Sequence, residues 1–278
     1  MMRPAMADIP APAAPRPSAW TLALRDVRDG VLNVRVWQML AWYEIRQRYK
    51  RSVLGPFWLT ISMGALVAAM GPLYGRLFNQ DVSAYFPYLA IGFIVWQLIS
   101  SLLVEAGQVF IVAQPYIHQV RMPFTVHVLR MIWRNVIVFL HNLVIVLVVL
   151  WWFPPKDPWL ALTALPGLLL VLLNAVWIGL LLGVLCARFR DIPPIITSLV
   201  QLAFFLTPVL WHKEMLGGIQ WAADLNPLYH LIELVRAPLL GQALPPHSWP
   251  AVLLMTALGF AVTLPFFARY RGRIAYWV

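Results

Sequence analysis

Few polar or ionisable side chains that could take part in chemistry stand within or near the long apolar segments of this sequence. Glu105, His141 and Asn142 are the clearest examples. An ionisable side chain in such a segment is costly to bury and is retained for a partner or a function. The adjacent His141 and Asn142 could serve hydrogen bonding between helices, substrate contact or catalysis, and the first is the common use of polar residues in apolar helices. No pair of carboxylates, Ser/His/Asp set or group of metal ligands is convincing, so we predict no catalytic residue and no metal site.

The single cysteine and the absence of a phosphate-binding loop restrict the chemistry further. Cys186 has no second thiol with which to form a disulfide or a metal site, and we interpret it as a small apolar residue. The sequence has no glycine-rich stretch ending in Gly-Lys-Ser or Gly-Lys-Thr, the pattern that cradles nucleotide phosphates. If the protein moves a cargo at the expense of ATP, another subunit must bind the nucleotide.

The composition indicates that lipid surrounds most of the chain. Of the 278 residues, 61% are hydrophobic and 12% are charged, whereas a soluble domain carries roughly 25% charged residues. The apolar blocks are long enough to cross about 30 Å of hydrocarbon as helices. We therefore expect an all-α integral membrane protein with six transmembrane helices, near Phe57–Phe78, Tyr88–Val104, Arg134–Phe153, Trp159–Ala187, Ile195–Trp211 and Trp249–Ala268. Prolines, including Pro56, Pro87 and Pro250, are expected to mark their edges.

Lysine and arginine are distributed unevenly between the loops. If the N-terminus is cytoplasmic, 17 of the 21 basic residues fall on the cytoplasmic side of the six expected spans. Only Arg76, Lys156, Lys213 and Arg236 fall elsewhere. Because cytoplasmic loops are enriched in these residues, we expect a multi-pass protein of the cell inner membrane with both termini in the cytoplasm. The same distribution explains the net charge of +10 without nucleic acid as a partner.

Three segments differ from the apolar blocks in composition. Residues 1–20 are rich in Ala and Pro, which predicts a disordered cytoplasmic extension. Residues 21–56 are basic and aromatic, a pattern typical of an amphipathic helix on the inner membrane surface. Within the six-span domain at 57–278, residues 212–248 are too long for a tight turn and are interrupted by glycine and proline. Short re-entrant helices between the fifth and sixth spans would fit this pattern.

Three stretches resemble one family of transport proteins. The run from Arg46 to Trp58 has a basic-Tyr-basic sequence followed by Ser-x-Leu-Gly-x-x-Trp. It resembles the beginning of the first span in the ABC-2 family of transporter membrane subunits. The stretches Ala187 to Trp211 and Leu225 to Gly241 resemble the branch of that family that exports O-antigen, capsule and teichoic acid chains. The resemblance extends from about Trp37 to the C-terminus.

The resemblance implies a homodimer of six-span subunits bound to two copies of a separate ATP-binding-cassette subunit. That partner would hold ATP and magnesium, so the chain itself would carry no cofactor and would not be an enzyme. The channel would lie between the protomers, within the membrane lipids, and would pass a lipid-linked polysaccharide.

The resemblance also assigns positions along the chain. The helix from Trp37 to Arg51 would rest on the ATPase, and the loop from Ala113 to Arg121 would hold the coupling helix unless it is an ordinary solvated turn. The residues expected to contact the ATPase are Trp37, Trp42, Arg46, Arg48, Gln114, Tyr116, Ile117, His118 and Arg121. The segment from Pro227 to Gly241 would be an outer gate, with the polar residues Tyr229, His230, Glu233 and Arg236. His230 and Glu233 stand three apart and share a helical face, where a structural role and direct glycan contact are both open.

Aromatic residues within the spans could line the cargo path. Most of the 14 Trp, 14 Phe and 9 Tyr residues fit the two interfacial belts of a membrane protein. Trp96, Phe204 and Phe205 stand where a belt does not explain them, and Tyr88 and Trp211 would lie nearer the outer mouth. Flat sugar faces stack on aromatic rings, so such a path would let a glycan slide.

Two alternative functions remain open at this point. One is an ABC-2 exporter of a small lipid or a drug. The other is a membrane-embedded enzyme that modifies glycans with His141 or His230 as a base.

Overall fold

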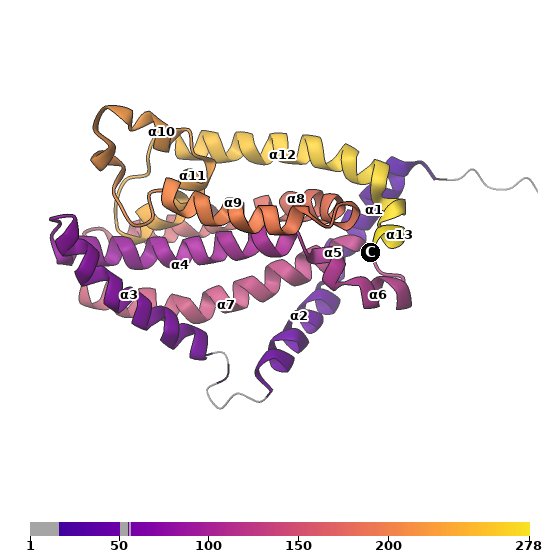
Figure 1. Ribbon diagram of the computed structural model, residues 1–278, viewed down its shortest axis with the longest axis horizontal. Coiled ribbons are helices and arrows are strands. Elements are labelled where there is room, and N and C mark those ends of the chain that lie inside the picture. The colour runs from indigo at the N-terminus through magenta and orange to yellow at the C-terminus, as the bar shows by residue number, and fades with distance from the viewer. Residues whose placement is uncertain (1–16, 51–54, 56) are drawn as a thin grey trace, which may run out of the picture.

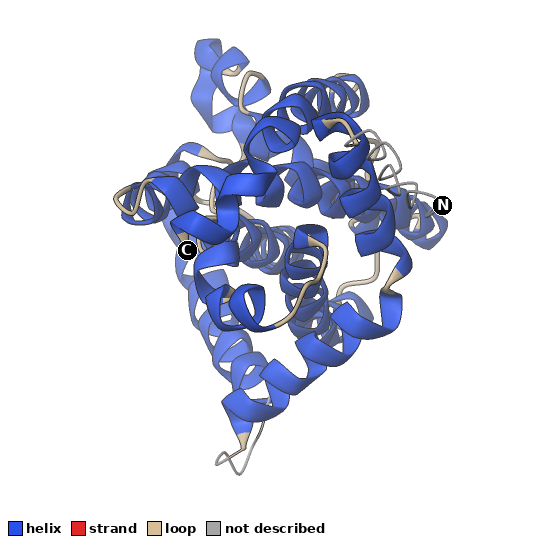
Figure 2. Ribbon diagram, turned by 90° about the vertical axis from the view of Figure 1, so that its right-hand side faces the viewer, coloured by secondary structure: helices blue, strands red, loops and turns tan. Residues whose placement is uncertain are grey.

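The computed structural model describes residues 17–50, 55 and 57–278, and every regular element in this part of the chain is a helix (Figure 2). The first 16 residues of the expected disordered extension lie outside the described residues, as do Arg51 to Leu54 and Pro56 of the first family-like stretch. The long helices form an elongated bundle (Figure 1). One end carries α1, α6 and α13 and is called the termini end, and the opposite end carries α10 and α11 and is called the far end.

Five helical stretches are long and apolar enough to cross a membrane. They are α3 (Phe57–Leu77), α4 (Val82–Ala106), α7 (Phe124–Trp152), η1 (Pro158–Thr163) with α8 (Ala164–Arg188), and α12 (Ser248–Tyr270) with η3 (Arg271–Arg273) and α13 (Ile274–Trp277). Each exceeds the roughly 20 residues that a transmembrane helix needs. The chain is therefore a multi-pass membrane protein, and five of the six expected spans correspond to one of these helices.

The expected fifth span is shorter than predicted. Helix α9 (Ile192–Leu206) has 15 residues, about 22 Å at 1.5 Å per residue, and so falls short of the hydrocarbon thickness. It ends because Pro208 disfavours the helical conformation at the preceding residue, and Thr207 is indeed extended. The segment from Thr207 to Leu210 is buried as non-helical chain, so a sixth span stays a prediction.

Helix α4 is the centre of the bundle and contacts α3, α7, α8, α9 and α11. Its side chains are buried on most sides, which explains why its sequence has no polar stripe. Pro87 lies inside α4, so the prediction that this proline marks the beginning of a helix is wrong. The missing amide leaves the carbonyl of Ser83 without its helical partner, and that residue is exposed, so water can reach it.

The basic, aromatic segment before α3 forms two helices rather than one. These are α1 (Ala19–Leu32) and α2 (Val34–Tyr49), separated at Asn33. The Ser18 side chain caps α1 by accepting a hydrogen bond from the amide of Thr21, a typical N-cap. Both helices pack on α7, and α1 also packs on α12.

Two short connections complete the chain. Helices α5 (Val109–Val112) and α6 (Gln114–Gln119) join α4 to α7 at the termini end. At the far end, η2 (Lys213–Ile219), α10 (Trp221–Asp224) and α11 (Pro227–Leu239) join α9 to α12. Helix α11 is buried over nearly its whole length against α4, α8, α12 and η1. It is a short helix between the fifth and sixth expected spans, as the sequence predicts. Its re-entrant placement in a membrane stays a prediction.

Candidate functional site

At the termini end, one buried arginine connects three helices. Arg130 of α7 is 1% exposed, and its Nη1 lies 3.0 Å from Oε1 of Glu44 on α2. The Cζ atom of Arg130 also lies 5.2 Å from the ring centroid of Tyr116 on α6, within the range of a cation–π contact. The helix expected to rest on a partner and the helix expected to couple to it are thus fixed to the same side chain.

A second arginine one turn along α7 extends this contact to α4. Arg134 forms ion pairs with Glu44 and with Glu105 of α4, the latter at 2.7 Å. Asn135 donates a further hydrogen bond to Glu105. We call Glu44, Glu105, Arg130, Arg134 and Asn135 the charged network. Its members are mostly buried, and each charged side chain has an opposite charge beside it, which offsets part of the cost of burial. Nε and Nη1 of Arg130 still lack a hydrogen-bond partner among the described residues.

Sequence reasoning missed most of the charged network. The sequence predicts that the third span begins at Arg134 and leaves Arg130 in a loop, but this prediction is wrong, because α7 begins at Phe124. The available signal was their spacing of four, which places both on one face of a helix. Glu44 stands in a basic segment that gives no sign of its role, and its partners Arg130 and Arg134 follow much later in the sequence.

The residues expected to contact the ATPase divide into exposed and packed groups. On α2, Trp42, Arg46 and Arg48 are exposed, whereas Trp37 packs edge to face on Trp133 with ring centroids 5.6 Å apart. Around α6, the exposed residues are Gln114, His118 and Arg121, and the half-buried ones are Tyr116 and Ile117. The exposed residues form a surface that a partner could contact. The packed residues attach α2 and α6 to the bundle.

The carboxylate of Asp26 joins α1 to the beginning of α7 and to Arg271, which follows α12. Asp26 is 3% exposed and accepts hydrogen bonds from the amides of Phe124 and Thr125 at 3.1 and 3.0 Å. It therefore caps α7 in place of a local residue. Arg271 pairs with the same carboxylate at 2.7 Å. Neither Asp26 nor Arg271 was singled out from the sequence.

At the far end, the buried cation is Arg236 of α11, which is 0% exposed. It forms an ion pair with Glu233 in its own helix, and its Nη1 donates to the carbonyl oxygen of Pro208 at 2.7 Å. Its Cζ lies 3.9 Å from the ring centroid of Tyr88. A Cβ atom at Gly92 would stand 2.9 Å from Nη1, so a larger residue there would force the guanidinium to shift.

Tyr88 connects this cluster to the chain that follows α9. Its hydroxyl donates to the carbonyl oxygens of Pro208 at 3.0 Å and Trp211 at 2.9 Å. The ring of His212 lies on Tyr88 with centroids 3.8 Å apart. Burial, together with the nearby Arg236 guanidinium, lowers the pKa of His212, so its imidazole is neutral at neutral pH. The structure thus brings Tyr88 and Trp211 of the expected path together with Arg236 of the expected gate.

The remaining polar residues of the expected gate turn to other partners. His230 lies 3.0 Å from Oγ of Ser248 and 2.7 Å from the carbonyl oxygen of Asp224. Tyr229 is 3% exposed and packs beside His230 with ring centroids 5.3 Å apart. His230 and Glu233 therefore share a helix but not a site. Their contacts favour the structural role over direct glycan contact.

Three rings of the expected path, from α4 and α9, form one contacting group. Phe204 packs on Trp96 and on Phe205, with ring centroids 5.6 and 5.3 Å apart. Trp96 is 6% exposed, whereas Phe205 is 68% exposed. Phe205 is thus the exposed ring of this group.

The candidate general bases do not form a catalytic arrangement. Nδ1 of His141 lies 2.7 Å from the carbonyl oxygen of Ile137 in its own helix, and Asn142 is buried with its side-chain oxygen unpaired among the described residues. Cys186 is buried, in keeping with a packing role. In the described part of the chain, no three His, Cys, Asp or Glu side chains are placed to hold a metal ion.

The comparison with protein families gives one match. Residues 35–240 match the family model described as ABC-2 type transporter. No curated protein matches the chain. The matched region runs from α2 to α11, so it includes the charged network and the Arg236 cluster but not Asp26 or Arg271.

Proposed function

We propose, from the premise that this chain belongs to the ABC-2 type transporter family, that it is the membrane subunit of an exporter of lipid-linked polysaccharide. A membrane domain of this family is a transport component and is not itself catalytic, and the family usually pairs with an ATPase subunit. The proposal adds the cargo, a homodimeric state, two copies of the ATPase, and placement in the inner membrane with both termini cytoplasmic.

The charged network supports docking of the ATPase at the termini end. Arg130 holds Glu44 of α2 and Tyr116 of α6 at once, so a force applied to either helix acts on α7. The exposed Trp42, Arg46 and Arg48 give the partner an aromatic and basic surface. The C-terminal segment is close by, because Nε2 of His118 lies 3.3 Å from the main-chain oxygen of Val278.

The observation that carries the cargo proposal is the contact between the two stretches that resemble polysaccharide exporters. Arg236 of the second stretch donates to the Pro208 carbonyl of the first. The side-chain amide of Asn226 also donates to Oγ1 of Thr207 at 2.9 Å. The two stretches thus build one structural unit at the far end, next to Tyr88 and the aromatic rings of α4 and α9.

The cargo is tested by removing the protein from cells and restoring it. We expect surface polysaccharide to fall at least about tenfold on removal, lipid-linked glycan to accumulate inside, and both to recover when the chain is restored with its ATPase. A hydrolysis-deficient ATPase is the matched control and should not restore export. Unchanged surface glycan with altered accumulation of small amphiphiles would instead identify the exporter of a small lipid or drug.

Two further outcomes separate the remaining alternatives. A purified chain that modifies glycan without any nucleotide-binding partner would identify the enzyme and overturn the transport proposal. The topology is tested with a reporter fused after Val278, which should be active only in its cytoplasmic form. Activity of a periplasm-specific reporter at that position would contradict the proposed orientation.

A further inference from the structure

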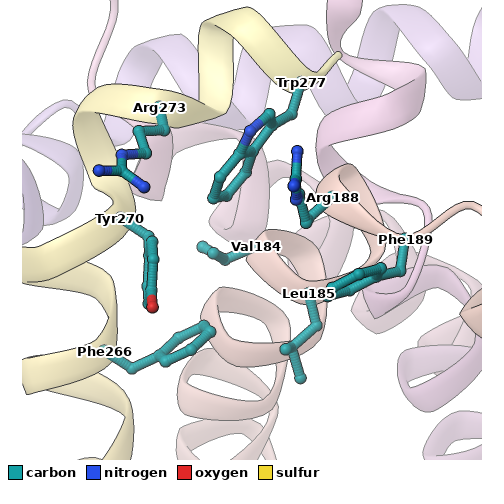
Figure 3. A pocket seen from close by; sticks show the side chains of 8 residues that line it. All are labelled: Val184, Leu185, Arg188, Phe189, Phe266, Tyr270, Arg273 and Trp277. Atoms are coloured by element: carbon teal, nitrogen blue, oxygen red, sulfur yellow. The ribbon is translucent and has the colours of Figure 1, made fainter.

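A cavity of about 340 Å³ lies at the termini end, between the last turn of α8 and the segment α12–α13. Its inner wall is apolar and includes Val184 and Phe266. Figure 3 shows Trp277 between Arg273 and Arg188, at the rim of this cavity. The volume lies within the range of about 300–1,000 Å³ that is typical of small-ligand pockets.

The two arginines at the rim are exposed and lack an acidic partner. No carboxylate in the described part of the chain lies within ion-pair distance of Arg188 or Arg273. Each guanidinium instead makes a cation–π contact, with the Cζ of Arg188 5.5 Å from the Trp277 centroid and that of Arg273 5.9 Å from the Tyr270 centroid. A cation–π contact uses none of the N–H donors of a guanidinium in hydrogen bonds, so these donors can bind oxygen atoms.

A cation at the C-terminus of a helix is also favoured by the helix dipole, and Arg188 ends α8. That effect explains a positive charge at this position. It does not explain an open cavity with apolar aromatic walls between two such charges. A phosphate on a hydrocarbon chain matches both parts of the cavity, because basic pockets between transmembrane helices bind lipid head groups.

We propose that this cavity binds an anionic phospholipid of the membrane leaflet at the termini end. The phosphate lies between Arg188 and Arg273, and the first part of the acyl chain lies against Phe266 and Val184. Arg188 ends a helix that is long enough to span the membrane, which places the rim at head-group depth. The site holds the junction of α8 and α13, and it does not depend on which cargo the protein exports.

The test uses the purified full chain in detergent and native mass spectrometry to count retained lipids. We expect phosphatidylglycerol to bind in preference to phosphatidylcholine. The double variant Arg188→Gln/Arg273→Gln should weaken phosphatidylglycerol binding about tenfold or more, since each arginine near an anionic surface contributes about 1 kcal/mol. The control Arg25→Gln/Arg28→Gln removes the same charge from exposed positions of α1 and should bind as the parent chain does.

Several results would overturn the proposal. These are equal retention of the two lipids, equal loss in the control variant, or full competition by inorganic phosphate alone. Displacement of phosphatidylglycerol by a polyprenyl phosphate at lower concentration would assign the cavity to the cargo lipid instead.

A measurement on the parent chain covers the case in which the double variant does not fold. Phosphatidylglycerol with a brominated tail should quench part of the tryptophan fluorescence, and Trp277→Phe should lack that quenched part. Equal quenching in the two chains would contradict the proposed position of the lipid. No transport is measured in either assay, so failure of the lipid site and failure of the export proposal are distinguishable.

Discussion

Each end of the bundle buries an arginine beside a glutamate and over a tyrosine ring, but the two arginines join different parts of the chain. Arg236 holds a glutamate of its own helix and the backbone of Pro208. Arg130 holds side chains from two other helices, Glu44 on α2 and Tyr116 on α6. Both arginines lie over a tyrosine of another helix, but only Arg236 also binds a backbone carbonyl, and only Arg130 pairs with a glutamate of another helix. We therefore predict that the far end is the more rigid unit and that the termini end is a movable joint.

The largest expected effect on stability comes from removing the cation of the rigid unit. Arg236→Met leaves Glu233 buried without a partner, which costs about 3–5 kcal/mol in soluble proteins. We expect a much lower yield of folded protein and a large drop in melting temperature. The double variant Glu233→Gln/Arg236→Met should recover part of the loss because no buried charge remains. A melting temperature unchanged in Arg236→Met would show that this end is not rigid.

The packing of α11 against α8 gives the next largest effect. A Cβ atom at Gly167 would clash with the backbone carbonyl of Leu234, whereas at Gly64 the nearest atoms stand 3.8 Å away. We expect Gly167→Ala to destabilise the protein by about 1–3 kcal/mol and Gly64→Ala to have no such cost. Thermal unfolding of the two variants side by side measures the difference. Equal behaviour would mean that α11 can shift to make room.

At the movable joint, we expect a smaller loss of stability than at the far end. We expect a larger loss of coupling between ATP hydrolysis and export. Arg130→Met frees α2 and α6 from the same anchor, and Glu44 can still pair with Arg134. Export should then fall while ATP hydrolysis by the assembled complex continues. Both rates are measured in reconstituted vesicles, with the exposed Arg28 changed to Met as the control. Proportional loss of both rates would contradict a coupling role.

Ile117 tests α6 in the same joint, and the yield of folded protein is measured as well because its side chain is half-buried and packs against the core. Ile117→Asp is a cleaner test than Tyr116→Asp, because an aspartate at position 116 could pair with Arg130. We expect Ile117→Asp to weaken ATPase binding, since burying an unpaired carboxylate in an interface is unfavourable. Pull-down of the ATPase measures the loss. Normal assembly and export would exclude α6 from the contact.

The smallest effect on stability is expected at Phe205. Because its side chain is 68% exposed, Phe205→Ala should change unfolding by less than about 0.5 kcal/mol. If the ring belongs to the cargo path, surface glycan should nevertheless decrease. Phe204→Ala is the matched comparison, since that ring packs on Trp96 and Phe93 and its loss should also reduce protein yield. Parallel loss of glycan and yield for Phe205 would assign it to packing between subunits.

Hydropathy and span length were enough to predict the helical membrane fold and the existence of α3, α4, α7, α8 and α12, but they placed the beginning of α7 ten residues too late. They could not predict where α9 ends, because its apolar sequence continues to Trp211 while Pro208 interrupts the helix. Nor could they predict the charged network, whose ion pairs join positions 44, 105, 130 and 134 on three helices. Such pairs depend on tertiary packing, which a local pattern does not contain. The family resemblance placed α6 correctly as a short helix, but its contact with Arg130 required the structure.

The Asp26 contact has a consequence for how the protein is made. Asp26 is synthesised early, yet its cationic partner Arg271 follows 245 positions later. Until the last helix has been inserted, this carboxylate has no counter-ion in the folded arrangement, and α1 lacks part of the surface on which it packs. Helix α1 therefore completes its packing only after α12 has been inserted. A nascent chain that stops before Arg271 would leave the Asp26 carboxylate without this counter-ion.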